Sequence, residues 1–292
     1  MLHLGDIAPG AFMAIDYEAE YNNRARVPEH PQIFARWERE AAAHRAETLN
    51  SSRAELGLAY GATPRQTIDV FDPAGEASAL ALFIHGGYWR SLAPSQFSHL
   101  AKGLNGHGVK VAVAGYDLCP QVAIGDIIAQ MRQACLFLWR RYGRKILVYG
   151  HSAGGHLAAC LLATDWPAVL PGAPRDLVPA AVAISGLFDL TPLTGVSMNA
   201  DLRLSAAEAR AVSPLFWPAP AGLILEAWCG ALESGEFRRQ NRIIAEAWAK
   251  AGVATACLEV PDTNHFTVVD PLADPGSELT GRLVALAQRA RS

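Results

Sequence analysis

The pentapeptide Gly150-His151-Ser152-Ala153-Gly154 places one serine between two glycines. An apolar run at 146–149 precedes it, and a run rich in alanine and leucine follows it to near Thr164. A serine on a tight turn between a strand and a helix is strained, and its hydroxyl is held clear of the sheet. The backbone N–H of Ala153 then faces any oxyanion that forms on an attacked carbonyl. This pattern predicts acyl transfer with Ser152 as the nucleophile.

A second glycine motif, His85-Gly86-Gly87-Tyr88-Trp89, follows the apolar run 79–84. Glycines let a backbone approach a substrate carbonyl closely with its N–H groups unhindered. We expect the N–H groups of Gly87 and Ala153 to form an oxyanion hole, with Gly86 as the alternative donor. Loss of one such donor costs roughly 3–4 kcal/mol of transition-state stabilisation.

The general base can be chosen by elimination among nine histidines. In hydrolases with this serine turn, the triad runs serine, acid, histidine along the chain, and only His265 lies beyond the helix after Ser152. We therefore predict His265 as the base. His151 and His156 are expected to pack beside the nucleophile or tune it, and His85 to brace its own loop through a hydrogen bond.

The acid should lie in the loop 228–236, after an apolar run at 221–227. Glu233 is the preferred candidate because it falls within the loop, where it could orient the imidazole. Glu236 could instead favour the start of the next helix electrostatically. Asp189 and Asp262 are further candidates, with turn or capping roles as their alternatives.

Short apolar runs alternate along the chain with helical patterns, which is typical of βαβ units. We predict an edge or antiparallel strand at 66–71, and central parallel strands at 79–84, 109–114, 146–149, 180–184, 221–227 and 255–260. Helices are expected at 124–142, 237–251 and 278–290. The fold class is therefore α/β, with a mostly parallel, doubly wound sheet covered by helices on both faces.

Two regions stand outside this alternation. An N-terminal arm, 1–52, contains a predicted helix from Pro31 to about Leu49. The insert 186–220 is long enough to form a lid or a pocket wall, and Ser205 with Glu208 should cap a short helix inside it. No shift in composition marks a linker, so we expect one domain over 1–292.

Composition argues against several classes of function. The net charge of −3 gives no electrostatic footprint for nucleic acid, and no window is long and apolar enough to span a bilayer. Residues 1–12 lack the pattern of a secretory signal.

Five cysteines without C-x-x-C spacing favour reduced thiols in a cytoplasmic protein. We also expect no metal, no cofactor and a small-molecule substrate. A homodimer is a candidate assembly.

Several motifs together resemble the kynurenine formamidase (arylformamidase) branch of the α/β-hydrolases. The likeness extends from about Tyr17 to the last strand, and its motifs are Tyr21-Asn22-Asn23-Arg24, His85-Gly86-Gly87-Tyr88-Trp89, Tyr116-Asp117-Leu118-Cys119-Pro120, Gly150-His151-Ser152-Ala153-Gly154-Gly155-His156, Gly186-Leu187-Phe188-Asp189-Leu190 and Glu236-Phe237-Arg238-Arg239-Gln240. By position, the resemblance implies a triad of Ser152, Glu233 and His265. The chain departs from the branch at Glu233, where aspartate is usual.

Three functions follow as hypotheses. The resemblance implies hydrolysis of an aryl formamide, such as N-formylkynurenine, through an acyl-enzyme. A carboxylesterase that acts on short acyl esters is the alternative, because the branch does not fix the substrate. A hydrolase-fold binding protein without catalysis is disfavoured, since the serine turn, glycine loop and histidine are all intact. In either enzyme Tyr88, Trp89 and Phe188 are expected to line an apolar pocket, although core packing would account for each of them equally well.

Overall fold

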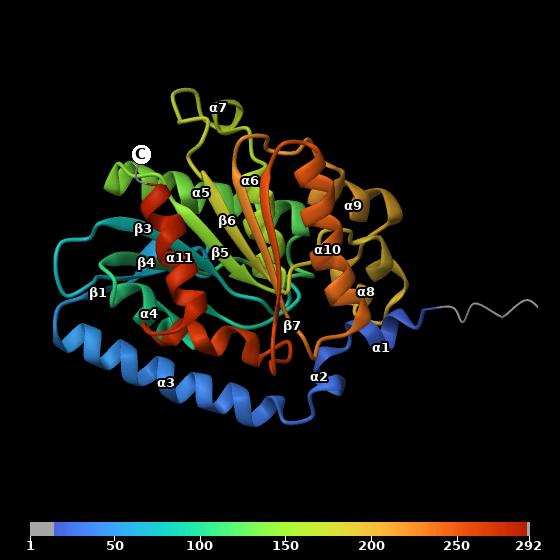
Figure 1. Ribbon diagram of the computed structural model, residues 1–292, viewed down its shortest axis with the longest axis horizontal. Coiled ribbons are helices and arrows are strands. Elements are labelled where there is room, and N and C mark those ends of the chain that lie inside the picture. The colour runs from blue at the N-terminus through green and yellow to red at the C-terminus, as the bar shows by residue number, and fades with distance from the viewer. Residues whose placement is uncertain (1–14, 291–292) are drawn as a thin grey trace, which may run out of the picture.

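A twisted eight-stranded sheet forms the centre of the protein (Figure 1). The computed structural model describes residues 15–290, so the segment 1–12, expected to carry no secretory signal, lies outside the described residues. The strand order is β1-β2-β4-β3-β5-β6-β7-β8, in which β2 pairs antiparallel with β1 and β4 while all other neighbours are parallel. The strands are β1 (Ala54–Ala59), β2 (Thr67–Phe71), β3 (Ala79–Ile84), β4 (Val109–Ala114), β5 (Leu147–His151), β6 (Ala180–Ile184), β7 (Ile224–Gly230) and β8 (Ala254–Val260).

The strands with continuous apolar sequences agree best with the prediction. β3 and β6 are buried at every residue, as expected for strands covered on both faces, and their bounds match the predicted ones. β2 is antiparallel as predicted, but β1 lies outside it and forms the edge of the sheet. Sequence analysis missed β1 because its residues alternate between half-buried and exposed and carry no apolar run.

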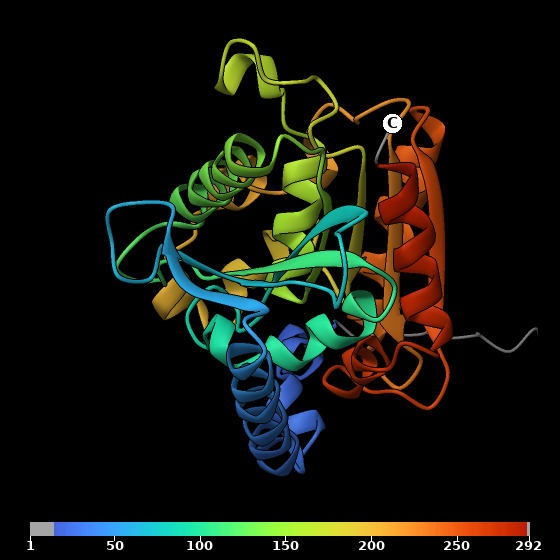
Figure 2. The same ribbon diagram turned by 90° about the vertical axis from the view of Figure 1, so that its left-hand side faces the viewer.

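Helices cover both faces of the sheet (Figure 2). Leu80 and Leu82 of β3 belong to a core with side chains of α5 (Ile124–Tyr142), α6 (Ala153–Leu162) and α10 (Gly235–Lys250). Ala81 and Phe83 point the other way, to a second core with α3 (His30–Asn50), α4 (Ala101–Asn105) and α11 (Glu278–Arg289). This alternation follows from the two-residue period of a strand. Of the described helices, none is long and apolar enough to cross a membrane.

The insert 186–220 folds as short helical segments next to the carboxyl ends of the strands. Ser205 and Glu208 form the predicted capping box at the start of α9. The segments of the insert are η3 (Thr191–Gly195), α8 (Asn199–Leu202), α9 (Ala206–Ala211) and η4 (Pro214–Phe216). The remaining short elements of the chain are η1 (Pro94–Gln96), η2 (Ser98–Leu100), α7 (Trp166–Val169) and η5 (Thr267–Ala273).

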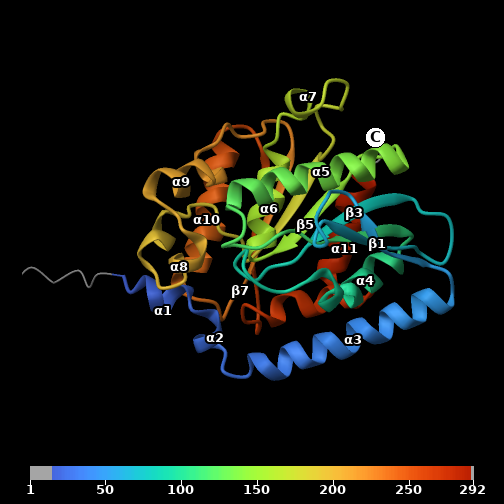
Figure 3. The same cartoon turned by 180° about the vertical axis from the view of Figure 1, so that it is seen from behind.

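The N-terminal arm reaches the same region. It contains α1 (Tyr17–Tyr21), α2 (Asn23–Arg26) and the predicted long helix, α3. In Figure 1 and in the opposite view of Figure 3, α1 lies beside α8 of the insert. Two hydrogen bonds join α1 to the segment of the insert just before α8: Glu18 accepts from the N–H of Ser197 at 2.6 Å and from its hydroxyl at 2.7 Å. The arm and the insert therefore meet over one end of the sheet.

Candidate active site

Ser152 occupies a strained turn between β5 and α6. Its backbone has φ 57° and ψ −116°, a conformation that costs a non-glycine residue on the order of 1–3 kcal/mol. A Cβ at Gly154 would lie 1.9 Å from the carbonyl oxygen of Ile84, and one at Gly150 would lie 2.2 Å from the carbonyl oxygen of Gly154. Only glycine fits at these two positions, so the strain at Ser152 is built into the packing of β5 and α6.

His265 and Glu233 form a buried hydrogen-bonded pair. The Nδ1 atom of His265 lies 2.8 Å from Oε2 of Glu233, and both side chains are at most 4% exposed. The other oxygen, Oε1, accepts from the hydroxyl of Ser185 and from the N–H of Gly230, each at 2.6 Å. With Nδ1–H donating to the carboxylate, Nε2 is the imidazole nitrogen that remains to take a proton.

The other acid candidates have different partners. Glu236 binds Arg239 at 2.7 Å and accepts from the hydroxyl of Tyr21 at 2.7 Å. Burial favours its neutral form, but these hydrogen bonds hold the pKa of Glu236 below its ordinary value. Asp189 accepts from the backbone and hydroxyl of Thr191, and Asp262 sits in a turn with φ 57°. Of the four candidates, the structure brings Glu233 to the imidazole.

Three buried histidines support the surrounding loops. His151 lies 2.7 Å, through Nε2, from the carbonyl oxygen of His265, and burial lowers its pKa to about 3, so it is neutral and donates. His85 contacts the carbonyl of Gly86 through Nδ1 at 2.8 Å, which confirms the expected bracing of the glycine loop. His156 contacts the carbonyl of Val212 at 2.7 Å and so connects α6 to the insert.

The glycine loop packs directly on the serine turn. A Cβ at Gly86 would lie 2.9 Å from the carbonyl oxygen of His151 and 3.0 Å from Cβ of Ser152. Gly87 has φ +98°, and a Cβ there would lie 2.4 Å from the carbonyl oxygen of Ser91. Ala153 is the first residue of α6, where backbone N–H groups have no partner within the helix. Gly86 and Ala153 therefore lie next to Ser152, and Gly87 lines the same cavity.

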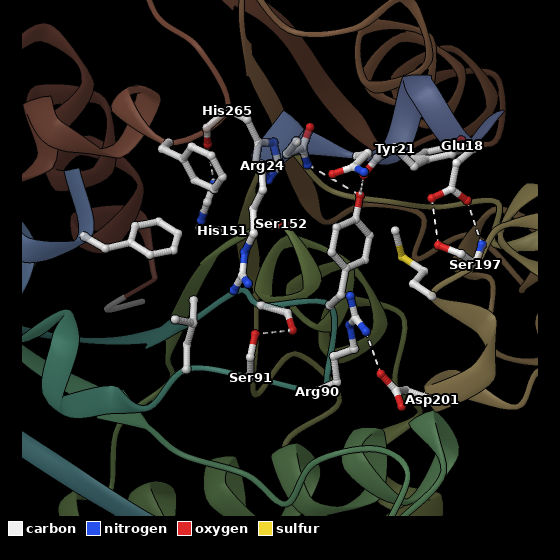
Figure 4. Close-up of a pocket in the computed structure, with 18 of the residues that line it drawn as sticks. Glu18, Tyr21, Arg24, Arg90, Ser91, His151, Ser152, Ser197, Asp201 and His265 are labelled. Atoms are coloured by element: carbon white, nitrogen blue, oxygen red, sulfur yellow. Dashed lines mark hydrogen bonds and ion pairs between the residues drawn. The ribbon is translucent and has the colours of Figure 1, made fainter. Parts of the chain in front are cut away.

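A cavity of about 310 Å³ opens over these residues (Figure 4). Its floor includes Gly87, His151, Ser152 and His265. The N-terminal arm contributes Glu18, Tyr21, Asn22, Asn23, Arg24, Phe34 and Trp37, and the insert contributes Ser197, Met198 and Asp201. A cavity of this size matches a small organic ligand.

The expected aromatic lining is only partly correct. Tyr88 lines the cavity. Trp89 and Phe188 are fully buried in the core instead: the Trp89 ring packs edge-on against His156 at 5.0 Å, and the backbone N–H of Phe188 is fixed by the side chain of Gln240. The side chains of Tyr88 and Trp89, neighbours on a strained loop, point in different directions. Membership of the glycine motif therefore did not predict which aromatic side chain lines the cavity.

Sequence reasoning missed the aromatic wall from the arm and from the histidine loop, which consists of Phe34, Trp37 and Phe266. The signal was the Tyr21-Asn22-Asn23-Arg24 motif, which lies far from the serine turn in sequence but lines the same cavity. Among residues 15–290, no group of three or more His, Cys, Asp or Glu could hold a metal ion.

Comparison with known proteins agrees with this geometry. Residues 81–269 match the family model described as the α/β hydrolase fold. The chain belongs to the α/β-hydrolase family. The fold class inferred from sequence is confirmed, and the protein is a hydrolase.

Within the α/β-hydrolases, this chain is similar to kynurenine formamidases over most of its length. The kynurenine formamidase of Danio rerio is 28% identical over 243 residues, which are 79% of this chain and 81% of that protein. The enzyme of the same name from Salmo salar is 29% identical over 244 residues, with the same coverage. A solved structure from Silicibacter sp., provisionally named a thioesterase, is 35% identical, covers 92% of this chain and 98% of its own, and has a TM-score of 0.83.

Proposed function

We propose that this hydrolase cleaves the carbon–nitrogen bond of an aryl formamide such as N-formylkynurenine through a formyl-enzyme. The observation that carries the proposal is the Glu233–His265 pair beside the strained Ser152, in a cavity with aromatic walls. The similarity to kynurenine formamidases supports the same substrate class.

In the first half of the reaction, His265 accepts the proton of the Ser152 hydroxyl while Oγ attacks the formyl carbon. The N–H groups of Gly87 and Ala153 donate to the resulting oxyanion, with Gly86 as the alternative donor. The tetrahedral intermediate collapses as His265 protonates the departing nitrogen, which releases the aryl amine and leaves a formyl ester on Ser152. Glu233 holds the imidazole in the required tautomer and stabilises its charged form.

In the second half, water enters and gives a proton to His265 as its oxygen attacks the formyl ester. The second tetrahedral intermediate uses the same oxyanion donors. Its collapse returns the proton from His265 to Oγ of Ser152 and releases formic acid, which ionises to formate, so that formamide and water become aryl amine, formate and a proton.

The cavity suits an aryl leaving group. Phe34 and Phe266 meet edge to face with ring centroids 5.1 Å apart, and both line the cavity with Trp37 and Tyr88. Aromatic side chains bind a planar ring through stacked or edge-to-face contacts, each worth about 0.5–1.5 kcal/mol beyond area burial.

A second candidate is hydrolysis of short acyl esters or thioesters, since the 35% identical solved structure carries the provisional name thioesterase. The test compares kcat/KM for N-formylkynurenine with that for 4-nitrophenyl acetate. We expect the formamide to be the better substrate, even though esters are intrinsically more reactive. Failure to turn over any N-formyl aryl substrate would remove the formamidase proposal in favour of the esterase.

A further inference from the structure

We infer that the cavity contains a carboxylate-binding subsite built on Arg24, so that the substrate cleaved at Ser152 carries a carboxylate. The inference rests on the proposed function for the identity of the bond that is cleaved. It adds the charge of the substrate and the residue that recognises it.

The two arginines that line the cavity differ in their partners. The Nη1 atom of Arg90 lies 2.5 Å from a carboxylate oxygen of Asp201, so its charge is already balanced within the wall. Arg24 also lines the cavity, yet within the described residues no hydrogen bond and no ion pair engages its guanidinium. Its neighbour Arg26, which points elsewhere, lies 3.8 Å from Glu20.

Arg24 is held in place by contacts that leave its N–H groups available. Its guanidinium carbon lies 5.9 Å from the ring centroid of Phe34, within the range of a cation–π contact. Such a contact orients the planar group without using its five donors, which match the two oxygens of a carboxylate. Figure 4 shows Arg24 together with His265 and Tyr21 among the residues that line the cavity.

The segment that carries Arg24 is anchored to the rest of the site. The hydroxyl of Tyr88 donates to the carbonyl of Tyr21 at 2.6 Å, and the buried hydroxyl of Tyr21 donates to Glu236 at 2.7 Å. Asn22 caps α2 by accepting from the N–H of Ala25 at 3.2 Å. These bonds fix the backbone at Arg24 relative to the glycine loop, while its side chain is exposed and lines the cavity.

The other charges of the cavity do not compete for this role. Asp201 is paired with Arg90, and both oxygens of Glu18 accept hydrogen bonds from Ser197. Among the described residues that line the cavity, Arg24 is therefore the one arginine without an acidic partner, and a substrate carboxylate would bind there. A neutral aryl formamide or a simple acyl ester would leave that guanidinium without a partner.

The test uses two substrates that differ in the amino-acid group that carries the carboxylate. N-formylkynurenine carries an amino-acid group, whereas 2-formamidoacetophenone keeps the aryl formamide and its ortho carbonyl but lacks that group. The ratio of their kcat/KM values is measured for the wild type, Arg24→Met, Arg24→Lys and the control Arg26→Met, which changes an arginine of the same helix that does not line the cavity.

We expect Arg24→Met to lower this ratio roughly 10- to 100-fold, mainly through KM, because a charge-assisted hydrogen bond to the substrate is lost. Arg24→Lys should give an intermediate ratio, since lysine keeps the positive charge but lacks the paired N–H donors of the guanidinium. Arg26→Met should change the ratio less than about threefold. Equal losses for both substrates in Arg24→Met, or a larger change of the ratio in Arg26→Met, would overturn the subsite.

If the protein is not a formamidase, the wild type will hydrolyse neither formamide, which is distinct from the results above. The same variants are then compared on 4-acetoxyphenylacetate and 4-methylphenyl acetate, an ester pair that differs in a carboxylate. A fall in that ratio for Arg24→Met would uphold the subsite without the formamidase activity, and equal losses would reject both.

Discussion

At the scale of single residues, the carboxylate of Glu233 is oriented because its two oxygens have different hydrogen-bond partners. Ser185 and Gly230 occupy Oε1, and Oε2 is left for His265 at 2.8 Å. Ser185 has φ 52°, a strained conformation for a residue other than glycine. The resembled branch usually has aspartate at this position. With Ser185 and Gly230 holding Oε1, the longer side chain of glutamate places Oε2 at hydrogen-bonding distance from the imidazole.

Replacing Glu233 by Gln should lower kcat roughly 10³- to 10⁴-fold with little change in KM, because the imidazole loses its tautomer and its countercharge. Steady-state kinetics on N-formylkynurenine provides the measurement. Glu236→Gln is the control, because it removes a carboxylate three residues away. It should lower the melting temperature and change kcat little. If Glu233→Gln kept near-normal kcat, the acid role would pass to another residue.

Ser185→Ala should lower kcat about 10-fold, since Glu233 loses a hydrogen bond to its charged group and is held less firmly. Ser213, which is equally buried and donates to the carbonyl of Ala209 at 2.7 Å, offers a matched control. Ser213→Ala should reduce the free energy of unfolding and leave kcat almost unchanged. Equal effects of the two variants on kcat would show that Ser185 has a structural role alone.

At the scale of elements, the central strands could be predicted and the walls of the cavity could not. β3 and β6 are continuous apolar runs because both of their faces are buried, β4 is interrupted by Lys110 alone, and such runs are visible in sequence. His265 could be predicted because the order of the triad along the chain left one histidine. The position of the N-terminal arm depends on contacts such as that between Tyr21 and Glu236, 215 residues apart, which no local pattern records.

The arm should depend on the hydroxyl of Tyr21, which also accepts from the amide of Gln240 at 3.0 Å. Tyr21→Phe removes one buried hydrogen bond from Glu236 and one from Gln240, which keep Arg239 and the carbonyl of Asp189 as partners. We expect a loss of about 1–3 kcal/mol in the free energy of unfolding and a raised KM. Urea unfolding and kinetics measure the two effects. Tyr142→Phe, which removes an exposed contact with Arg141, should change stability by less than about 0.5 kcal/mol. An unchanged KM in Tyr21→Phe would argue that the arm does not shape the site.

At the scale of the whole molecule, the fold buries several histidines in the neutral form. Burial lowers the pKa to about 4 for His85, His99 and His156 and to about 3 for His151. In the unfolded chain these imidazoles titrate near 6.5, so between about pH 6.5 and pH 4 the unfolded state binds more protons. Their contribution is complete above the unfolded pKa and is lost as the pH falls through the folded pKa.

We therefore expect the free energy of unfolding to fall by at least about 3 kcal/mol from pH 7 to pH 4, as measured by urea titrations. His99→Gln should reduce the slope, because it removes one of these buried imidazoles. A free energy of unfolding that stays constant over this range would contradict the assignment of neutral, buried histidines.

The central claim is that Ser152 performs the hydrolysis of an aryl formamide. The most direct measurement titrates the folded protein with a fluorophosphonate while following the release of kynurenine from N-formylkynurenine, and then locates the adduct by mass spectrometry. We expect one adduct per chain, on Ser152, and activity that declines in proportion to labelling. Activity that survives complete labelling of Ser152, or an adduct at another residue that abolishes activity, would contradict it.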